Sequence, residues 1–208
     1  MKRSIVIWLD GTFTCLERVD NAVLEDNLLT GSFVRLVELD PERDSKNWAK
    51  WRQNSEYLRL LDSGPAKLHS AKANQQWMEK HLDDWLEFEF NIQTLVEGKL
   101  IGTVGLEGNM RTHGDAFVGI GIGEPEHWGK GYGTDAMRII LRYAFMELGL
   151  HRVSLNVFGY NTRAIRSYEK AGFTIEAVSK GALRRDGQRW DMIWMGILAE
   201  EWRRKNAK

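Results

Sequence analysis

Three glycines at alternate positions mark the part of the sequence best suited to bind an anion. They lie in Trp128-Gly129-Lys130-Gly131-Tyr132-Gly133-Thr134, directly before a segment with strong helical periodicity. Because glycine has no Cβ, this loop can adopt positive φ angles and turn several backbone N–H groups toward one point. The following helix adds unpaired N–H groups and the positive end of its dipole. The combination predicts a site for a phosphate or a pyrophosphate.

The spacing of these glycines argues against two nucleotide-binding loops. A P-loop requires Gly-x4-Gly-Lys-Ser/Thr, but here Lys130 is followed by Gly131. A dinucleotide-binding fingerprint requires Gly-x-Gly-x-x-Gly, whereas this loop has Gly-x-Gly-x-Gly. A flexible glycine turn between a strand and a helix is the alternative without a ligand.

A second motif lies downstream and runs from Asn161 to Phe173 as N-T-R-A-I-R-S-Y-E-K-A-G-F. Together with the glycine loop, it resembles the GNAT acyltransferase superfamily over roughly residues 30–200. In that family the motif Gln/Arg-x-x-Gly-x-Gly/Ala cradles the pyrophosphate of acetyl-coenzyme A, and Trp128 takes the Gln/Arg position here. Asn161 and Tyr168 match the second family signature. The segments Ser32–Leu36 and Glu201-Trp202 resemble the RimJ/RimL-like branch, which includes enzymes that acetylate protein N-termini.

The resemblance implies an N-acetyltransferase that uses acetyl-CoA and works by direct attack in a ternary complex. It implies an α+β fold, with a mixed and mostly antiparallel sheet flanked by helices. The expected acceptor is a primary amine, first a protein N-terminal residue of the ribosomal-protein type. An α-amino group with a pKa of about 7.7–8 loses its proton more easily than lysine at about 10.4. A polyamine or aminoglycoside acceptor is the alternative, and a non-catalytic acyl-CoA-binding sensor is another.

The chemistry of amine acetylation assigns roles to titratable residues. The attacking amine must lose a proton, and the departing thiolate leaves more readily if it receives one. Tyr168 is the expected proton donor, with a half-buried aromatic on the inner face of its helix as the alternative. Glu107 and Asp115 are the expected bases, acting through water, and solvated surface carboxylates are the alternative.

The cofactor is expected to contact the glycine loop, an exposed strand edge and the start of the second helix. The peptide-like pantetheine arm can pair with a strand edge as an added strand would. The residues with this expected role are Gly119, Ile120, Gly121, Ile122, Trp128, Gly129, Lys130, Gly131, Tyr132, Gly133, Thr134, Asn156, Asn161, Arg163, Ala164 and Tyr168. Asn161 is equally well interpreted as a helix N-cap. Leu61, Trp190 and Asp191 are expected to contact the acceptor, and no metal site is expected.

Hydrophobic periodicity places these residues on strands and helices. Strands are expected over residues 33–39, 90–96, 100–106, 116–122, 153–157, 173–178 and 190–198. Helices are expected from Pro41, from Ser70 as N-cap, after the glycine loop and over 161–170, with a loop over 60–70. The expected helix anchors in the core are Trp48, Trp51, Trp77, Trp85 and Trp202.

Composition narrows the classes of function. The chain of 208 residues has 29 Lys+Arg and 29 Asp+Glu, so it lacks the basic character of a nucleic-acid binder. Its single cysteine and short apolar runs predict a cytoplasmic protein with no membrane partner, and a homodimer is one option. We expect an N-terminal extension over 1–30 with a hairpin that turns at Asp10-Gly11. A single acetyltransferase domain follows over 31–203, with a tail over 204–208.

Overall fold

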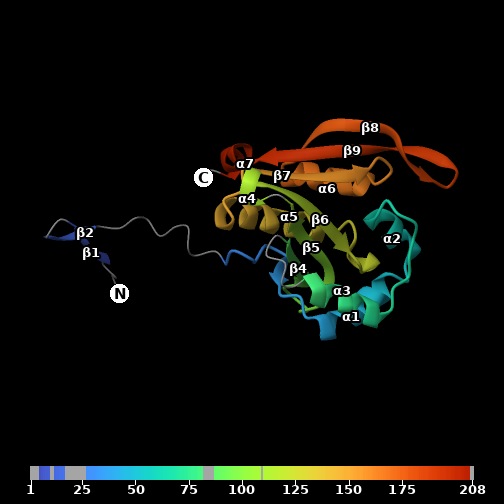
Figure 1. Ribbon diagram of the computed structural model, residues 1–208, viewed down its shortest axis with the longest axis horizontal. Coiled ribbons are helices and arrows are strands. Elements are labelled where there is room, and N and C mark those ends of the chain that lie inside the picture. The colour runs from blue at the N-terminus through green and yellow to red at the C-terminus, as the bar shows by residue number, and fades with distance from the viewer. Residues whose placement is uncertain (1–4, 10–11, 17–26, 82–86, 109, 207–208) are drawn as a thin grey trace.

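A computed structural model describes residues 5–9, 12–16, 27–81, 87–108 and 110–206 (Figure 1). Its main sheet has seven strands in the order β3-β4-β5-β6-β7-β9-β8. These strands are β3 (Val34–Val37), β4 (Glu87–Thr94), β5 (Leu100–Glu107), β6 (Asp115–Ile122), β7 (Arg152–Phe158), β8 (Thr174–Arg185) and β9 (Gln188–Leu198). Neighbouring strands are antiparallel except for β6 and β7, which are parallel. The expected α+β fold with a mixed, mostly antiparallel sheet is therefore confirmed.

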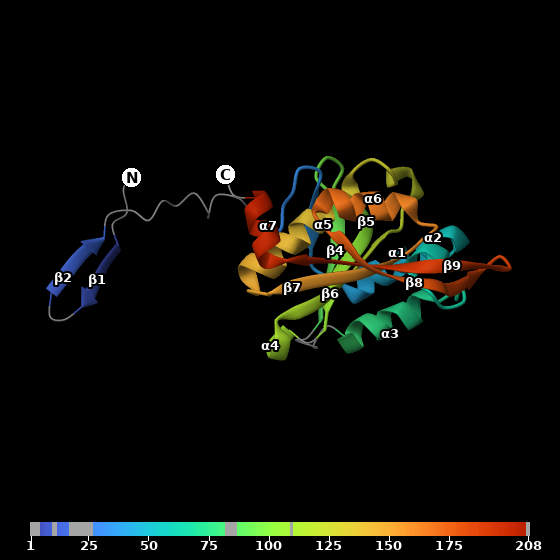
Figure 2. The same cartoon turned by 90° about the horizontal axis from the view of Figure 1, so that it is seen from above.

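Helices cover both faces of this sheet (Figures 1 and 2). The helices are α1 (Pro41–Trp51), α2 (Ser55–Leu61), α3 (Ala71–His81), α4 (Met110–His113), α5 (Tyr132–Arg142), α6 (Thr162–Ala171) and α7 (Ala199–Asn206), with short turns η1 (Pro125–His127) and η2 (Tyr143–Glu147). The larger hydrophobic cluster joins α5, η2 and the strands, and a smaller one joins α1, α2 and α3. The sheet therefore lies between two apolar layers. None of the described helices has the length and apolar character of a membrane span.

Local sequence signals account for several element boundaries. Asp40 caps α1 by accepting the amide of Arg43 at 3.0 Å, and Ser70 caps α3 by accepting the amide of Ala73 at 3.2 Å. The turn between β8 and β9 consists of Asp186 and Gly187, whose φ angles are 49° and 73°. Positive φ at both turn residues matches the twist of a two-residue hairpin.

Some expectations differ from the structure. Asn54 caps α2, and that helix continues to Leu61. The loop expected over 60–70 therefore begins only at Asp62. Trp77 is 43% exposed, so its assignment as a core anchor is wrong. Trp85 lies outside the described residues.

The expected N-terminal hairpin is present as β1 (Ile5–Leu9) and β2 (Thr12–Leu16), which pair antiparallel. Its expected turn residues, Asp10 and Gly11, lie outside the described residues. The domain limits proposed at 30 and 203 stay predictions.

A gap opens in the sheet where β6 separates from β7. The two strands pair only from Asp115–Arg152 to Phe117–Ser154. On its other side, β6 pairs with β5 from Phe117 opposite Glu107 to Ile122 opposite Gly102. Residues 118–122 of β6 therefore carry a backbone edge that no neighbouring strand occupies. This edge lies beside the glycine loop.

Candidate active site

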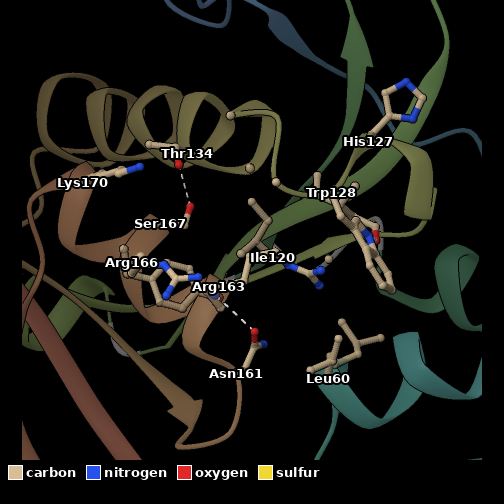
Figure 3. Close-up of a pocket in the computed structure, with 18 of the residues that line it drawn as sticks. Leu60, Ile120, His127, Trp128, Thr134, Asn161, Arg163, Arg166, Ser167 and Lys170 are labelled. Carbon is tan, nitrogen blue, oxygen red and sulfur yellow. Dashed lines mark hydrogen bonds between the residues drawn. The ribbon is translucent and has the colours of Figure 1, made fainter.

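Two cavities meet at the gap between β6 and β7. The first, the loop cavity, has a volume of about 260 Å³ and lies between the glycine loop, α5 and α6 (Figure 3). The second, the sheet cavity, has a volume of about 440 Å³ and lies between α1, α3 and strands β4 to β7. The residues that line both are Tyr57, Leu60, Leu61, Ile120, Gly121, Asn161 and Tyr168. A ligand in one cavity can reach a ligand in the other through this junction.

The glycine loop presents bare backbone to the loop cavity. Gly129 and Gly131 have φ angles of 73° and 92°, as the sequence predicts. A Cβ at Gly129 would meet no atom within 4 Å, and one at Gly131 would meet only Phe33 at 3.8 Å. The glycines are therefore required by backbone conformation rather than by crowding. Gly131 is also the N-cap of α5, so the amides of its first turn are available to a ligand.

Trp128 supports the loop and holds a cation beside it. Its indole Nε1–H donates a hydrogen bond to the carbonyl of Ile122 at 2.7 Å. The guanidinium of Arg163 lies over the indole ring, 4.2 Å from its centroid. Figure 3 shows the two side chains approaching each other from the loop and from α6. The tryptophan at the Gln/Arg position of the motif thus contributes a cation–π contact, which the sequence did not predict.

The charges of the side chains that line the loop cavity suit a polyanion. Its lining includes the basic residues His127, Arg163, Arg166 and Lys170 and no aspartate or glutamate. Asp135, in the first turn of α5, points elsewhere: its carboxylate accepts hydrogen bonds from the amides of Ser32, Phe33 and Val34 at 3.1, 2.7 and 3.0 Å. This carboxylate joins β3 to α5. The cavity therefore fits the phosphates of coenzyme A.

Helix α6 closes the loop cavity from below. The Oδ1 of Asn161 accepts the amide of Ala164 at 3.2 Å, which confirms the N-cap interpretation. Asn161 also lines both cavities, so it can contact a ligand in either of them. The hydroxyls of Thr134 and Ser167 lie 2.7 Å apart and join α5 to α6 (Figure 3). Lys130 and Tyr132 do not line the cavity, although both belong to the loop.

The two glycines on β6 have different surroundings. A Cβ at Gly119 would meet no atom within 4 Å, so this position opens onto the sheet cavity. A Cβ at Gly121 would lie 2.8 Å from the hydroxyl of Tyr57 and 2.9 Å from Cδ1 of Leu61. Glycine at 121 therefore allows α2 to pack closely on this face of β6.

Two phenols lie at the junction. Burial raises the pKa of Tyr168 to about 12, which keeps its hydroxyl protonated at neutral pH. Tyr57 is 7% exposed, and burial, with a smaller contribution from Glu89, raises its pKa to about 12 as well. The sequence pointed to Tyr168 through the second motif. It offered no such signal for Tyr57, which reaches the site from α2.

The acidic residues near the site differ in whether they line a cavity. Glu107 lines the sheet cavity, as expected of a base. Asp115 lines neither cavity and pairs across the strands with Arg152. A hydrogen bond to Glu176 raises the pKa of that guanidinium, and the charge of Asp115 makes a smaller contribution. Sequence reasoning missed Glu89, which lines the sheet cavity from β4. Its carboxylate lies over Gly105, where a Cβ would be 2.1 Å from Oε2.

Aromatic side chains form the far wall of the sheet cavity. Trp48 and Trp77 approach with ring centroids 5.5 Å apart, and Trp77 stacks on His81 at 4.2 Å. Trp77 is exposed because it lines the sheet cavity, although it also packs against the rings of Trp48 and His81. Aromatic faces next to carboxylates suit a protonated amine. The aromatic residues that line the cavity are Trp48, Trp51, Tyr57, Trp77, Phe117, Phe158 and Tyr168.

The residues expected to contact the acceptor are placed unequally. Leu61 lines both cavities. Trp190 lines neither and packs on Tyr160 at 5.4 Å, which in turn packs on Phe158 of the sheet cavity at 5.4 Å. The carboxylate of Asp191 accepts the amide of Gly181 at 2.8 Å. Asn156, expected at the cofactor, lines the sheet cavity instead.

The chain is similar to known acetyltransferases. A family model described as "Acetyltransferase (GNAT) domain" matches residues 34–174. The probable N-acetyltransferase YjcK of Bacillus subtilis is 36% identical over 124 residues, 58% of this chain and 66% of that protein. The spermidine N(1)-acetyltransferase of Escherichia coli K12 is 32% identical over 124 residues, 60% of this chain and 65% of that protein. These matches span just under two thirds of either relative.

A solved structure extends the similarity to three dimensions. The spermidine N-acetyltransferase from Vibrio cholerae, in complex with CoA and spermine, has a TM-score of 0.73 and 27% identity. The match covers 81% of this chain and 97% of that one.

Proposed function

Because the chain belongs to the GNAT acetyltransferase family, we propose that this acetyl-CoA-dependent N-acetyltransferase acts on a small cationic amine, with polyamines as the acceptor class. The observation that carries the proposal is the junction of two cavities with different linings. One presents amides and cations without a carboxylate, and the other presents aromatic rings and the carboxylates of Glu89 and Glu107, together with Arg52 and His81. Relatives named for spermidine support a small-molecule acceptor over the protein N-terminus expected from the sequence. Membership of the RimJ/RimL-like branch, a homodimer and a cytoplasmic location stay predictions.

The loop cavity is assigned to the cofactor. The amides of residues 129–134 and the guanidinium of Arg163 bind its diphosphate. The free edge of β6 over 118–122 pairs with its peptide-like arm. When bound, acetyl-CoA supplies a thioester whose carbonyl carbon is open to attack by an amine. The amides on that edge are placed to stabilise charge that develops on the carbonyl oxygen.

Tyr168 is assigned the role of stabilising the sulfur that departs from acetyl-CoA. A phenol with a pKa of about 12 transfers its proton to a thiolate only uphill, because an ordinary thiol has a pKa of about 8.5. Its hydroxyl therefore acts as a neutral hydrogen-bond donor that stabilises the departing sulfur. The proton that the sulfur finally takes is the one that the acceptor amine releases.

The sheet cavity is assigned to the acceptor. Glu107 accepts the proton of the attacking ammonium through water, as expected from the sequence. Glu89 binds a second, remote ammonium group of the same acceptor, with the rings of Trp48 and Trp77 against its methylene chain. Asp115 has no part in this arrangement because it lies outside both cavities. An acceptor with two separated amines uses both carboxylates, which a peptide N-terminus does not require.

The test is a thiol-release assay with acetyl-CoA and three acceptors: spermidine, an aminoglycoside and a peptide with a free N-terminus. Spermidine is expected to give the highest kcat/KM. Glu89→Gln is expected to raise the KM for spermidine about 10- to 100-fold, the range for losing a charged hydrogen bond. Glu97→Gln, on an exposed turn, is the matched control. Calorimetry should show unchanged binding of CoA by both variants.

Three results would contradict the proposal. A higher kcat/KM for the peptide than for spermidine would indicate that the acceptor is a protein N-terminus. An unchanged KM in Glu89→Gln would remove that residue from acceptor binding. If CoA binds but no acceptor raises thiol release above background, the protein is an acyl-CoA sensor.

A further inference from the structure

An arginine in the sheet cavity has no acidic partner. Arg52 lines this cavity together with Glu89 and Glu107 and is partly buried. Its side chain takes no part in the ion pairs or hydrogen bonds found for the residues that the structure describes. A guanidinium has five N–H donors, no acceptor and a permanent positive charge. These donors are therefore available to a ligand in the cavity.

The other basic residue of this cavity already has a partner. His81 stacks on Trp77 with ring centroids 4.2 Å apart, and its Nδ1 lies 2.6 Å from the carbonyl oxygen of the same residue. Arg52 is the C-cap of α1, but the cap is made by its backbone N–H, which bonds to the carbonyls of Lys50 and Trp48. Across the described ranges, no polar contact gives the side chain of Arg52 a role in the fold.

Arg52 lies near the junction where the acceptor reacts. Burial raises the pKa of Tyr57 to about 12, the charge of Arg52 opposes this shift, and the charge of Glu89 adds to it. Tyr57 lines both cavities. A cation from the end of α1 and a carboxylate from β4 thus act on one phenol at the junction. A ligand beside Tyr57 therefore experiences charges of both signs.

An acceptor with amines alone satisfies only part of this lining. Its ammonium groups pair with Glu89 and Glu107, but they are repelled by Arg52. A carboxylate on the same acceptor reverses that contribution, because a guanidinium binds a carboxylate through two parallel N–H···O hydrogen bonds. The lining as a whole thus fits a molecule that has two amines and one carboxylate.

We propose that the enzyme also acetylates diamines that carry a carboxylate, with Arg52 as the residue that binds this carboxylate. The chemical class is that of α,ω-diamino acids such as ornithine and lysine. This further activity rests on the proposed use of the sheet cavity by a cationic acceptor. The reaction itself is unchanged: the amine nitrogen bonds to the acetyl carbon, the C–S bond breaks, and the proton that the amine releases ends on the sulfur.

Two pairs of acceptors that differ only in a carboxylate test this inference: putrescine against ornithine, and cadaverine against lysine. Arg52→Gln is expected to raise the KM for the two amino acids about 10- to 100-fold in the thiol-release assay, as for a lost charged hydrogen bond. The KM for the two plain diamines should instead fall about 2-fold, because a repelling charge about 8 Å away has gone. The carboxylate therefore decides the sign of the effect.

Two further variants serve as controls. Arg52→Lys keeps the charge but loses the planar fork, so it should recover part of the affinity for ornithine. Lys46→Gln removes one positive charge from an exposed position on α1 outside both cavities. It should leave the KM of all four acceptors unchanged. Thermal unfolding of each variant shows whether a general loss of stability contributes, since such a loss would affect all four acceptors alike.

The outcomes separate this inference from the proposed function. If the wild-type enzyme acetylates putrescine but neither amino acid, the further activity is overturned and the polyamine assignment stands. A change of KM in Arg52→Gln that is equal for all four acceptors also overturns it, because Arg52 would then not distinguish the carboxylate. If none of these acceptors and not spermidine either raises thiol release, the proposed function falls and the further activity with it.

Discussion

A single methyl group on β6 tests the junction of the two cavities. In Gly121→Ala, the new Cβ would lie 2.8 Å from the hydroxyl of Tyr57 and 2.9 Å from Cδ1 of Leu61. Ordinary contacts of this kind are about 3.5–4.0 Å, so both side chains must retreat by roughly 1 Å. Both belong to α2. Tyr57 is buried, so its side chain cannot turn into solvent without loss of packing, whereas Leu61 is 37% exposed.

The expected cost follows from overpacking. Inserting a methyl group into a packed site typically destabilises a protein by about 1–3 kcal/mol. For a chain of this size, that corresponds to a fall in Tm of about 3–10 °C. A displacement of about 1 Å at a reacting centre can also lower the rate by about 100-fold. We therefore expect a loss of both stability and kcat/KM.

Gly119→Ala is the matched control for stability. It lies two residues away on the same face of β6, and its Cβ would meet no atom within 4 Å. Since alanine loses less backbone entropy than glycine, the Tm of this variant should stay level or rise. Thermal unfolding of the two variants under one set of conditions gives the comparison.

A combination of substitutions sharpens the test. Tyr57→Phe removes the hydroxyl that Gly121→Ala would meet first. The double variant should therefore recover part of the lost stability, as contacting residues do in a double-mutant cycle. If Gly121→Ala unfolds at the same temperature as Gly119→Ala and keeps full activity, α2 does not pack against β6. The placement of the junction would then be wrong.

Three further predictions concern other parts of the structure. Asp135→Ala leaves the three backbone amides at the start of β3 without their acceptor and should destabilise the protein by about 3 kcal/mol in urea unfolding; a loss below about 1 kcal/mol would contradict the assigned role. Trp128→Phe keeps an aromatic ring but loses the donor to the carbonyl of Ile122, so calorimetry should show about 5- to 10-fold weaker CoA binding. The raised pKa of Tyr57 contributes stability that is complete below about pH 10 and lost as the pH rises toward 12, because the unfolded phenol ionises first. Urea midpoints between pH 9 and 12 should fall less steeply in Tyr57→Phe than in the wild type.

Features that depend on consecutive residues could be predicted from the sequence. The positive φ angles of Gly129 and Gly131, the N-cap at Asn161 and the turn at Asp186-Gly187 each follow from local backbone chemistry. The order of strands and helices follows from hydrophobic periodicity in the same way. The order of the strands in the sheet, with β9 between β7 and β8, is set by pairing between distant segments.

The set of residues that line the sheet cavity depends on the register between strands. Glu89 and Glu107 come from different strands, and the antiparallel pairing of β4 and β5 brings both to the sheet cavity. Asp115 is near Glu107 in the chain but lies at the far end of β6 from the junction. Closeness to Glu107 in the sequence therefore favoured Asp115 over Glu89 as a site residue. In the structure, Glu89 lines the sheet cavity and Asp115 does not.

The sequence by itself determined the backbone conformation of the glycine loop and the helix start that follows it, because a glycine's freedom and a helix's dipole belong to a few adjacent residues. Only the tertiary structure decided that Tyr57 and the carboxylate of Glu89 lie at the sheet cavity. It also showed that the rings of Tyr160 and Phe158 separate Trp190 from that cavity. These placements arise from the packing of α2 on β6 and from strand pairing, and both depend on contacts between segments that are far apart in the chain.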